Sequence, residues 1–429
     1  MIGEPLTPED AQVLDTLRAH EPAALHSQVP LVWDRAGGAL VHDSAGRSWL
    51  DWTSGILTAN AGHAPDPVVA AVREQAERGL LHAYAFPTAV RARVVRALVE
   101  LTGYPQVVLL TTGAEAVEVS LKIARRHAMA RGRDRALVVS FDGGFHGRTM
   151  GAQLTGGLPA QQKWTGDGDG VFVRVPFPER GTRWSPRVME DALAAVGAGP
   201  QDVACVVGEV YQGSTMRVLD PAAARALRDW CTDRGVLLVV DEMQSGFGRT
   251  GTLFGYEQVG IRPDLLLCGK GLSGSLPVSA VLIGSPDWSA SLRPGELTST
   301  HGANPVCLAA AEANLELFRD GRLVAAARRL GRLLGEGLAA WAAGSPRRRR
   351  VITSFGAVAG LVTTRPDGAP DPVAARRLVA ECARRGLLLC APIQQHDGAL
   401  IKVMPPLTTS AEQLGEGLAI FDAASEAAC

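Results

Sequence analysis

The chain has 429 residues, a formal net charge of −1 and 46% hydrophobic residues. A chain of this length buries more than one small core, so we expect a large domain and at least one smaller one. The near-zero charge excludes long-range attraction to nucleic acid or an anionic membrane surface. No apolar run approaches the roughly 20 residues that span a bilayer.

The seven cysteines are scattered, form no C-x-x-C pair and lie mostly in apolar runs such as "DVACVV". This usage is typical of reduced, buried thiols and gives no metal-ligand spacing. The N-terminal stretch "MIGEPLTPEDAQ" is acidic and lacks the apolar segment of a signal peptide. We therefore predict a cytoplasmic protein without a metal site.

The first 60 residues hold short alternating runs separated by turns, such as "GGALVHDSAGRSWLDW". This pattern predicts short strands and tight turns rather than long helices. We assign residues 1–60 to the N-terminal part of a small domain.

From about residue 105 to 285, apolar runs alternate with segments of helical spacing. Continuous apolar strands that alternate with helices indicate a parallel sheet covered on both faces. Residues 61–310 are therefore predicted to form a large α/β domain. The predicted strands are 107–112, 135–141, 203–210, 236–242, 264–270 and 279–284, and the helices are 113–132 and 221–235.

After about residue 310 a long helical stretch leads into "VITSFGAVAGLVTT", a helix over "DPVAARRLVAECARRG" and the run "LLLCAPI". We expect residues 311–429 to complete the small α+β domain, which is then built from both chain ends.

Polar residues stand where the predicted strands end, and ligands of open α/β sheets bind at the carboxyl ends of strands. One crevice could therefore hold a phosphate cradle, an aromatic plane, acids and a lysine. These residues are Gly113 and Ala114 after the first strand, Phe145 and His146 after the second, Glu209 on the third, Asp241 and Gln244 after the fourth, and Lys270 at the end of the fifth.

Each part has a physical purpose. The start of a helix at Gly113 offers free N–H groups and a dipole that favour a phosphate. An ionised Asp241 could keep a pyridine nitrogen protonated, and Phe145 could stack on a flat ring. Lys270 could form a Schiff base if a desolvated, cation-rich site lowers its pKa from about 10.4.

At these residues the sequence resembles the class III (ω-type) pyridoxal-phosphate-dependent aminotransferases of fold type I. The resemblance covers nearly the whole chain and is carried by ordered blocks. These blocks are "TTGAEAVEVSLKIAR", "FDGGFHGRTMGA", "DEMQSGFGRTG", "CGKGLSGSLPVSAV" and "TSTHGANPVCLAAA". The resemblance implies a large domain with a mainly parallel seven-stranded sheet and a smaller α+β domain.

The resemblance also implies residue roles. Lys270 would carry pyridoxal 5'-phosphate as a Schiff base and later move a proton on the substrate. Asp241 would contact the pyridine nitrogen and Gln244 the ring hydroxyl. Thr300 would reach the phosphate of the neighbouring subunit, so at least a homodimer with shared sites is expected. Gly113 and Ala114 would hold the phosphate, with Phe145 over the ring and His146 beside it.

Two residues depart from the family pattern. Many members carry an arginine three residues before "PPL", where this chain has Lys402. Many also carry "EPxQGE", where "EVYQGS" here ends in Ser214 and has Val210 in place of proline. Because an ammonium cannot offer the guanidinium fork, we predict a substrate other than an ordinary dicarboxylate pair. An ω-amine, a diamine or an amino sugar would suit, as amine donor to a carbonyl acceptor.

Rival functions remain open within the fold and outside it. Racemases of the family often have an aspartate where Ser214 stands, and a decarboxylase pattern is compatible with serine. The run "GFGRTG" at 246–251 fits a dinucleotide motif of nicotinamide-dependent oxidoreductases, yet no long periodic helix follows it. Candidate substrate-pocket residues are Ile56, Tyr84, Phe86 and Lys402.

Overall fold

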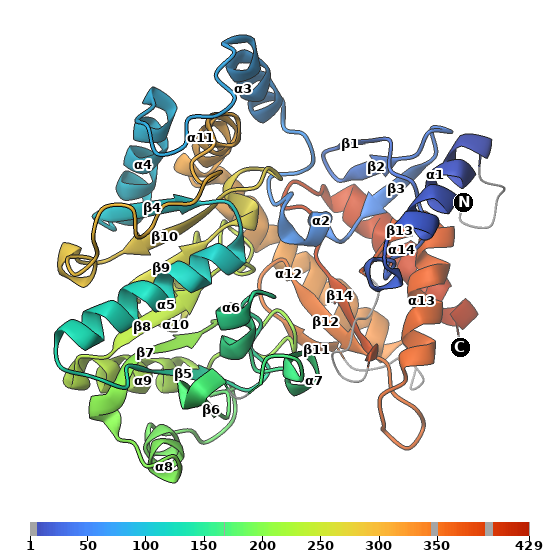
Figure 1. The fold of residues 1–429 in the computed structure, drawn as a ribbon. Helices are drawn as coiled ribbons and strands as arrows, with labels where there is room; N and C mark the ends of the chain where they lie inside the picture. Colours follow the sequence, from blue (N-terminus) through green and yellow to red (C-terminus); the bar gives the residue numbers. More distant parts are fainter. Residues whose placement is uncertain (1–6, 167, 345–350, 391–397, 429) are drawn as a thin grey trace. The chain divides into compact units, whose positions relative to one another are not determined.

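The protein is described by a computed structural model that covers residues 7–166, 168–344, 351–390 and 398–428 (Figure 1). The chain folds into two compact units. The smaller unit takes the described residues of Met1–Pro65, Arg249–Gly251 and Arg322–Cys429, and the larger takes Asp66–Gly248 and Thr252–Gly321.

The larger unit is an α/β domain around a seven-stranded sheet with the order β4-β10-β9-β8-β7-β5-β6. Neighbours from β9 to β6 are parallel, so the mainly parallel seven-stranded sheet that the sequence predicts is confirmed. The strands are β4 Gln106–Leu110, β5 Leu137–Phe141, β6 Phe172–Val175, β7 Val203–Gly208, β8 Leu237–Asp241, β9 Leu265–Cys268 and β10 Ser279–Ile283.

Two strands differ from the expected pattern. Strand β10 runs antiparallel to both β9 and β4. Between β9 and β10 the chain forms only the short 3₁₀ turn Lys270–Leu272, whereas a parallel return needs a crossover of a dozen or more residues. Strand β6 is absent from the predicted set, because it is a four-residue edge strand buried only at alternate positions.

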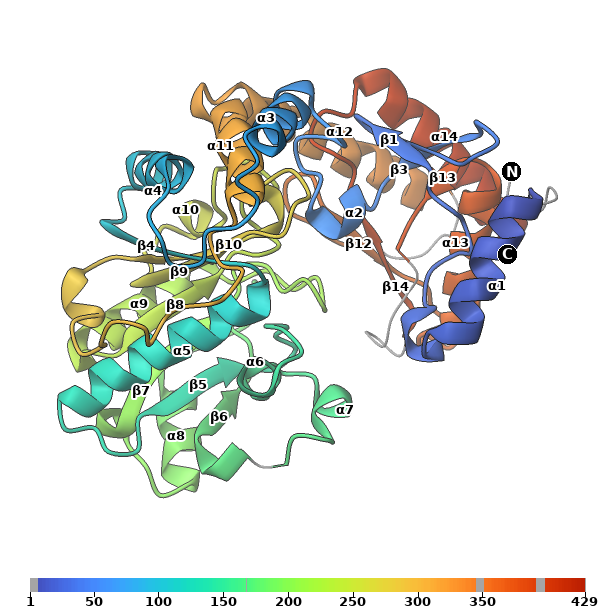
Figure 2. The same cartoon turned by 45° about the horizontal axis from the view of Figure 1, so that its top comes forward.

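Helix α5 (Gly113–Ala130) lies across one face of this sheet in both views (Figures 1 and 2). Its buried side chains, including Val117 and Leu121, join one core with Val207, Val239 and Leu267 of the strands. Strands β5, β8, β9 and β10 are buried at every position, as expected for a sheet covered on both faces. The other helices are α3 Asp66–Glu77, α4 Ala89–Thr102, α6 Met150–Thr155, α7 Pro159–Gln162, α8 Arg187–Ala195, α9 Pro221–Arg234, α10 Tyr256–Val259 and α11 Pro305–Arg319.

The smaller unit joins both ends of the chain. Strand β3 pairs in parallel with β13, with Leu50 opposite Leu387, and the Trp49 indole donates to the Ala383 carbonyl at 2.7 Å. Its sheets have the orders β1-β2-β3-β13 and β11-β12-β14. The elements are α1 Pro8–His20, β1 Arg35–Gly37, β2 Leu40–His42, β3 Ser48–Asp51, α2 Ser54–Leu57, α12 Arg322–Ala343, β11 Val351–Ser354, β12 Ala359–Val362, α13 Pro372–Arg384, β13 Leu387–Leu388, β14 Leu400–Val403 and α14 Ala411–Ala428.

Within the described ranges, every helix is too short or too polar to cross a membrane.

Candidate active site

A buried aspartate, Asp241, is the last residue of strand β8 in the larger unit. Asp241 is only 4% exposed, and its Oδ2 lies 2.8 Å from His146 Nδ1, while its Oδ1 accepts the Met243 N–H at 3.0 Å. Burial lowers the pKa of His146, but the hydrogen bond and negative charge of Asp241 outweigh it, so the net shift is upward. The buried imidazole of His146 therefore holds the Asp241 carboxylate in one orientation.

A second buried acid, Glu209, fixes the loop that carries His146. Its Oε2 accepts the Phe145 N–H at 3.0 Å and its Oε1 accepts the Gly213 N–H at 3.1 Å. Burial raises the pKa of Glu209 to about 7, with His146 opposing that shift and Asp241 adding to it. Glu209 thus positions the loop after β5 as well as the loop after β7.

The loop after β7 is tied to the loop after β5 by further contacts. Ser214, 2% exposed, donates its hydroxyl to the Gly143 carbonyl, and the Gln212 amide donates to the Asp142 carbonyl at 2.9 Å. A Cβ on Gly213 would lie 1.9 Å from the Gln244 amide nitrogen. Only glycine therefore lets Gln244 pack against this loop.

Helix α5 begins beside these loops with free donors. Thr112 and Glu115 form a capping box, in which Glu115 Oε2 accepts the Thr111 and Thr112 N–H groups at 3.0 and 2.8 Å. The Gly113 and Ala114 N–H groups, the first two of the helix, find no acceptor among the described residues. A Cβ on Gly147 would lie 2.8 Å from Ala114 Cβ, so the Phe145–His146 loop packs directly against this helix start.

Lys270 follows β9, the strand beside β8. Asp241 is paired with Leu267 in the register of the two strands. A Cβ on Gly269 would lie 2.7 Å from the Met243 sulfur, so the chain before Lys270 packs against the residues after Asp241. Lys270 is half-buried and has a positive φ of 45°, and the Asn314 amide holds the next carbonyls, those of Gly271 and Leu272, at 2.8 and 3.1 Å.

The larger unit therefore brings together the eight predicted cofactor-binding residues that belong to one chain. The ninth, Thr300, is exposed and follows Ser299, whose hydroxyl donates to Glu115 at 2.7 Å. No cluster of three or more histidine, cysteine or acidic side chains suited to a metal occurs in the part of the chain that the structure describes.

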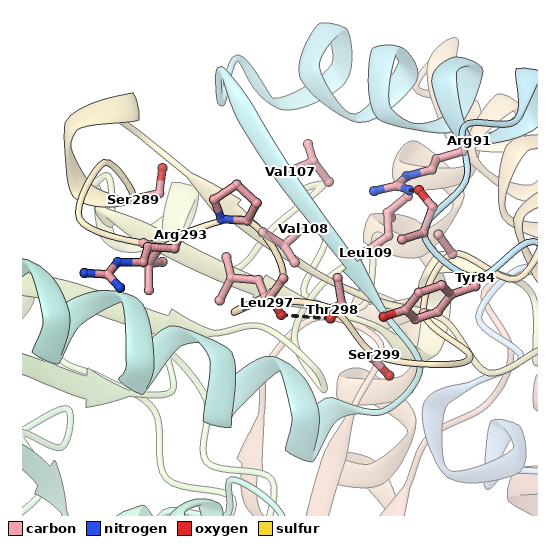
Figure 3. Close-up of a pocket in the computed structure, with 16 residues that line it drawn as sticks. Tyr84, Arg91, Val107, Val108, Leu109, Ser289, Arg293, Leu297, Thr298 and Ser299 are labelled. Atoms are coloured by element: carbon pink, nitrogen blue, oxygen red, sulfur yellow. Dashed lines mark hydrogen bonds between the residues drawn. The ribbon is translucent and has the colours of Figure 1, made fainter.

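The aromatic substrate candidates lie elsewhere in the larger unit. Tyr84 (φ 49°) lines a cavity of about 410 Å³ whose other walls include Arg91, Leu109 and Ser299, and its ring points toward the side of the cavity where Thr298 and Ser299 lie (Figure 3). Neither Lys270 nor Asp241 lines this cavity. Phe86 is 74% exposed.

The remaining substrate candidates belong to the smaller unit. Ile56, 43% exposed, lies in the turn of residues 54–57. Lys402 is half-buried on β14, opposite Gly360 of β12.

Three functional candidates escaped sequence reasoning. Glu115 was readable, because T-x-x-E before an apolar helix is a capping-box pattern. Arg148 is exposed and its guanidinium lies 5.6 Å from the Phe145 ring centroid, a contact that follows from the loop rather than from any spacing. Arg249 is fully buried, although it sits in a glycine-rich run that reads as a surface turn.

Comparisons with known proteins point to one family of enzymes. The family model described as aminotransferase class-III matches residues 23–424. A 2-aminoadipate transaminase from Pseudomonas putida is 35% identical over 92% of this chain and 95% of its own length. A 5-aminovalerate aminotransferase from the same organism is 33% identical over 92% and 93%. An ornithine aminotransferase structure from Toxoplasma gondii, with partial occupancy of pyridoxal phosphate at its active site, superposes with a TM-score of 0.86 at 29% identity over 99% of this chain and 96% of that one.

The titration of Glu209 yields a testable prediction about stability. Its pKa in the folded protein, about 7, lies above the ordinary value of 4.5, so the folded state holds a proton that the unfolded chain releases first. Stability from this group is present below pH 4.5 and falls as the pH rises toward 7, by at most about 3 kcal/mol. We expect Glu209→Gln, which cannot ionise, to flatten the decline in unfolding free energy between pH 5 and 8, measured by urea denaturation. Glu77→Gln, on an exposed acid, is the control. Equal slopes for wild type and Glu209→Gln would contradict the raised pKa.

Proposed function

The chain belongs to the class III aminotransferase family, whose cofactor is pyridoxal phosphate, and from that membership we propose that Lys270 and Asp241 are its catalytic residues. It is a pyridoxal-phosphate-dependent aminotransferase. The observation that carries the residue assignment is the placement of a buried carboxylate and a lysine at the ends of adjacent strands, β8 and β9.

The residues present fit this cofactor. The N–H groups of Gly113 and Ala114, which have no acceptor among the described residues, suit a phosphate. The Asp241 carboxylate suits a protonated pyridine nitrogen, and His146 keeps that carboxylate oriented. We assign Phe145 to the ring face and Gln244 to the ring hydroxyl. Glu209 holds the Phe145 backbone in place rather than contacting the ring.

When bound, the cofactor supplies an electron sink for the bonds at the substrate Cα. Lys270 is the group we assign to hold the cofactor aldehyde and then to move a proton at the substrate Cα as general base and general acid. Asp241 keeps the ring nitrogen protonated, and its burial strengthens that interaction because water does not screen it.

Lys270→Ala tests the assignment. We expect loss of at least about 10³-fold in turnover, since the variant has neither the covalent anchor nor the base, and loss of the absorbance band of lysine-bound cofactor. Lys122→Ala is the matched control, because the Lys122 ammonium donates to the Glu296 carbonyl at 2.9 Å in an exposed hydrogen bond. Wild-type activity in Lys270→Ala would end the assignment.

We propose that the donor is an ω-amino acid, an amine with one carboxylate at the far end of a carbon chain. One support is the relative that acts on 5-aminovalerate. The other is Arg148, an exposed guanidinium over the Phe145 ring that could bind a carboxylate. A diamine or an amino sugar would leave Arg148 without such a role.

A donor screen separates these classes. We expect 5-aminovalerate to exceed glutamate in kcat/KM, because Lys402 lacks the guanidinium fork that binds a second carboxylate. Lys402→Arg should raise kcat/KM for glutamate several-fold, with Lys163→Arg as control. Glutamate serving the wild type as well as any other donor would contradict the proposal.

We further propose a cytoplasmic homodimer with shared active sites. Six described cysteines are free, as in a reducing compartment. Leu80, Leu81 and Phe86 are exposed apolar side chains that lie close together in the sequence, and exposed apolar surface of this kind favours association. The exposure of Thr300 suits a side chain that serves a neighbouring subunit.

Subunit mixing tests the shared site. Lys270→Ala and Thr300→Val homodimers should both be weak at limiting cofactor. Co-refolded hybrids should recover activity, because the Lys270 subunit's site then receives Thr300 from its partner. If Thr300 acts within its own chain, the hybrids gain nothing.

A further inference from the structure

The turn of residues 54–57 in the smaller unit, labelled α2 and including Ile56, has a strained backbone. Ser54, Gly55, Ile56 and Leu57 have consecutive φ values of 48°, 56°, 60° and 67°. Only glycine adopts this left-handed region without cost, and a β-branched residue there is an outlier. Such a conformation persists only where neighbouring groups enforce it, and it concentrates at functional sites.

One enforcing group is the carboxylate of Asp51, which is fully buried. Its Oδ1 accepts the Thr53 N–H at 2.8 Å, and its Oδ2 accepts the Gly55 N–H at 3.2 Å and lies 2.7 Å from His63 Nε2. Asp51 therefore fixes the entry into the turn.

The second enforcing group is the guanidinium of Arg249, which is also fully buried. Its Nη2 donates to Ser54 Oγ at 3.2 Å and to Asn60 Oδ1 at 2.7 Å. Its Nη1 donates to the Ala357 and Pro405 carbonyls at 2.8 and 2.7 Å. One planar fork thus joins both sides of the turn to two C-terminal segments.

The same network reaches the strand of Lys402. Ser54 Oγ donates to the Met404 carbonyl at 2.5 Å, and the Met404 N–H donates to the Trp52 carbonyl at 2.8 Å. The turn that presents Ile56 and the segment that follows Lys402 are therefore held in one geometry, with Arg249 bonded to both.

We infer that Arg249 is a positioning residue for substrate selection: through Ser54 and Pro405 it fixes the strained turn of Ile56 against the segment after Lys402. This rests on the proposed function and on the sequence prediction that Ile56 and Lys402 line the substrate pocket. Being fully buried, Arg249 acts through these residues and not by contact. A lysine could keep the charge but not span both Ser54 and Pro405, because an ammonium is a point charge without the fork.

The test compares wild type, Arg249→Lys and Ser54→Ala, each as holoenzyme, with 5-aminovalerate and 4-aminobutyrate, which differ by one methylene. The readout is the ratio of kcat/KM for the two donors, with the cofactor absorbance as a check on loading. Both variants should change that ratio by roughly tenfold, mainly through KM, since sub-ångström displacements at a substrate wall have effects of this order. Ser54→Ala removes only one hydroxyl and covers the case in which Arg249→Lys does not fold.

Arg133→Lys is the matched control. Arg133 also donates to two backbone carbonyls, those of Val203 and Arg234, but lies in the larger unit. It should lower the melting temperature and leave the donor ratio unchanged.

An unchanged ratio in Ser54→Ala and in folded Arg249→Lys, with melting temperatures lowered as in the control, overturns the inference and leaves the proposed function standing. A wild type whose cofactor absorbance does not respond to either donor refutes the proposed substrate class, and the inference falls with it.

Discussion

The active-site architecture depends on a negative charge held away from water at the end of β8. An ionised carboxylate in an interior is stable only when its oxygens are paired. Asp241 has a backbone N–H on one oxygen and His146 on the other, and His146 stays in place because Glu209 holds the preceding residue's N–H. A cationic ring brought to this carboxylate meets an oriented partner and little competing water, which is the electrostatic preorganisation that an aminotransferase needs.

Most of this arrangement can be predicted from the sequence, because it follows from chain order and strand direction. Apolar runs fix where β7, β8 and β9 end, and parallel strands bring those ends to one edge. Asp241 and Lys270 are therefore neighbours for a topological reason. The features that the sequence does not predict depend on contacts between distant segments. The antiparallel direction of β10 follows from a short connection whose residues resemble any loop. The left-handed turn at Ile56 is imposed by Asp51 and Arg249, not by local preference.

The block "DEMQSGFGRTG" contributes residues to both compact units. Its residues through Gly248 belong to the larger unit, with Asp241 at the end of β8, whereas Arg249–Gly251 belong to the smaller one. A Cβ on Gly356 would lie 2.4 Å from the Thr250 carbonyl carbon, so this tripeptide is packed tightly into the smaller unit. A fully buried guanidinium is costly to desolvate, and its hydrogen bonds to oxygens of three segments offset that cost. The glycine spacing of "GFGRTG" therefore serves close packing in this protein, although it matches a dinucleotide-binding motif.

Two residues of this chain, Ser214 and Lys402, depart from the family pattern. Ser214 is buried and its hydroxyl donates to the Gly143 carbonyl. This hydrogen bond joins the loop after β7 to the loop after β5. A carboxylate in its place would bring a further negative charge to the loop that Glu209 holds, where burial already raises an acid's pKa. Family members with the "EPxQGE" pattern have a glutamate at the position of Ser214, and many members have an arginine at the position of Lys402. This chain has a neutral, hydrogen-bonded serine and a lysine instead, and under the proposed function the exposed Arg148 beside Phe145 would receive the carboxylate of the substrate.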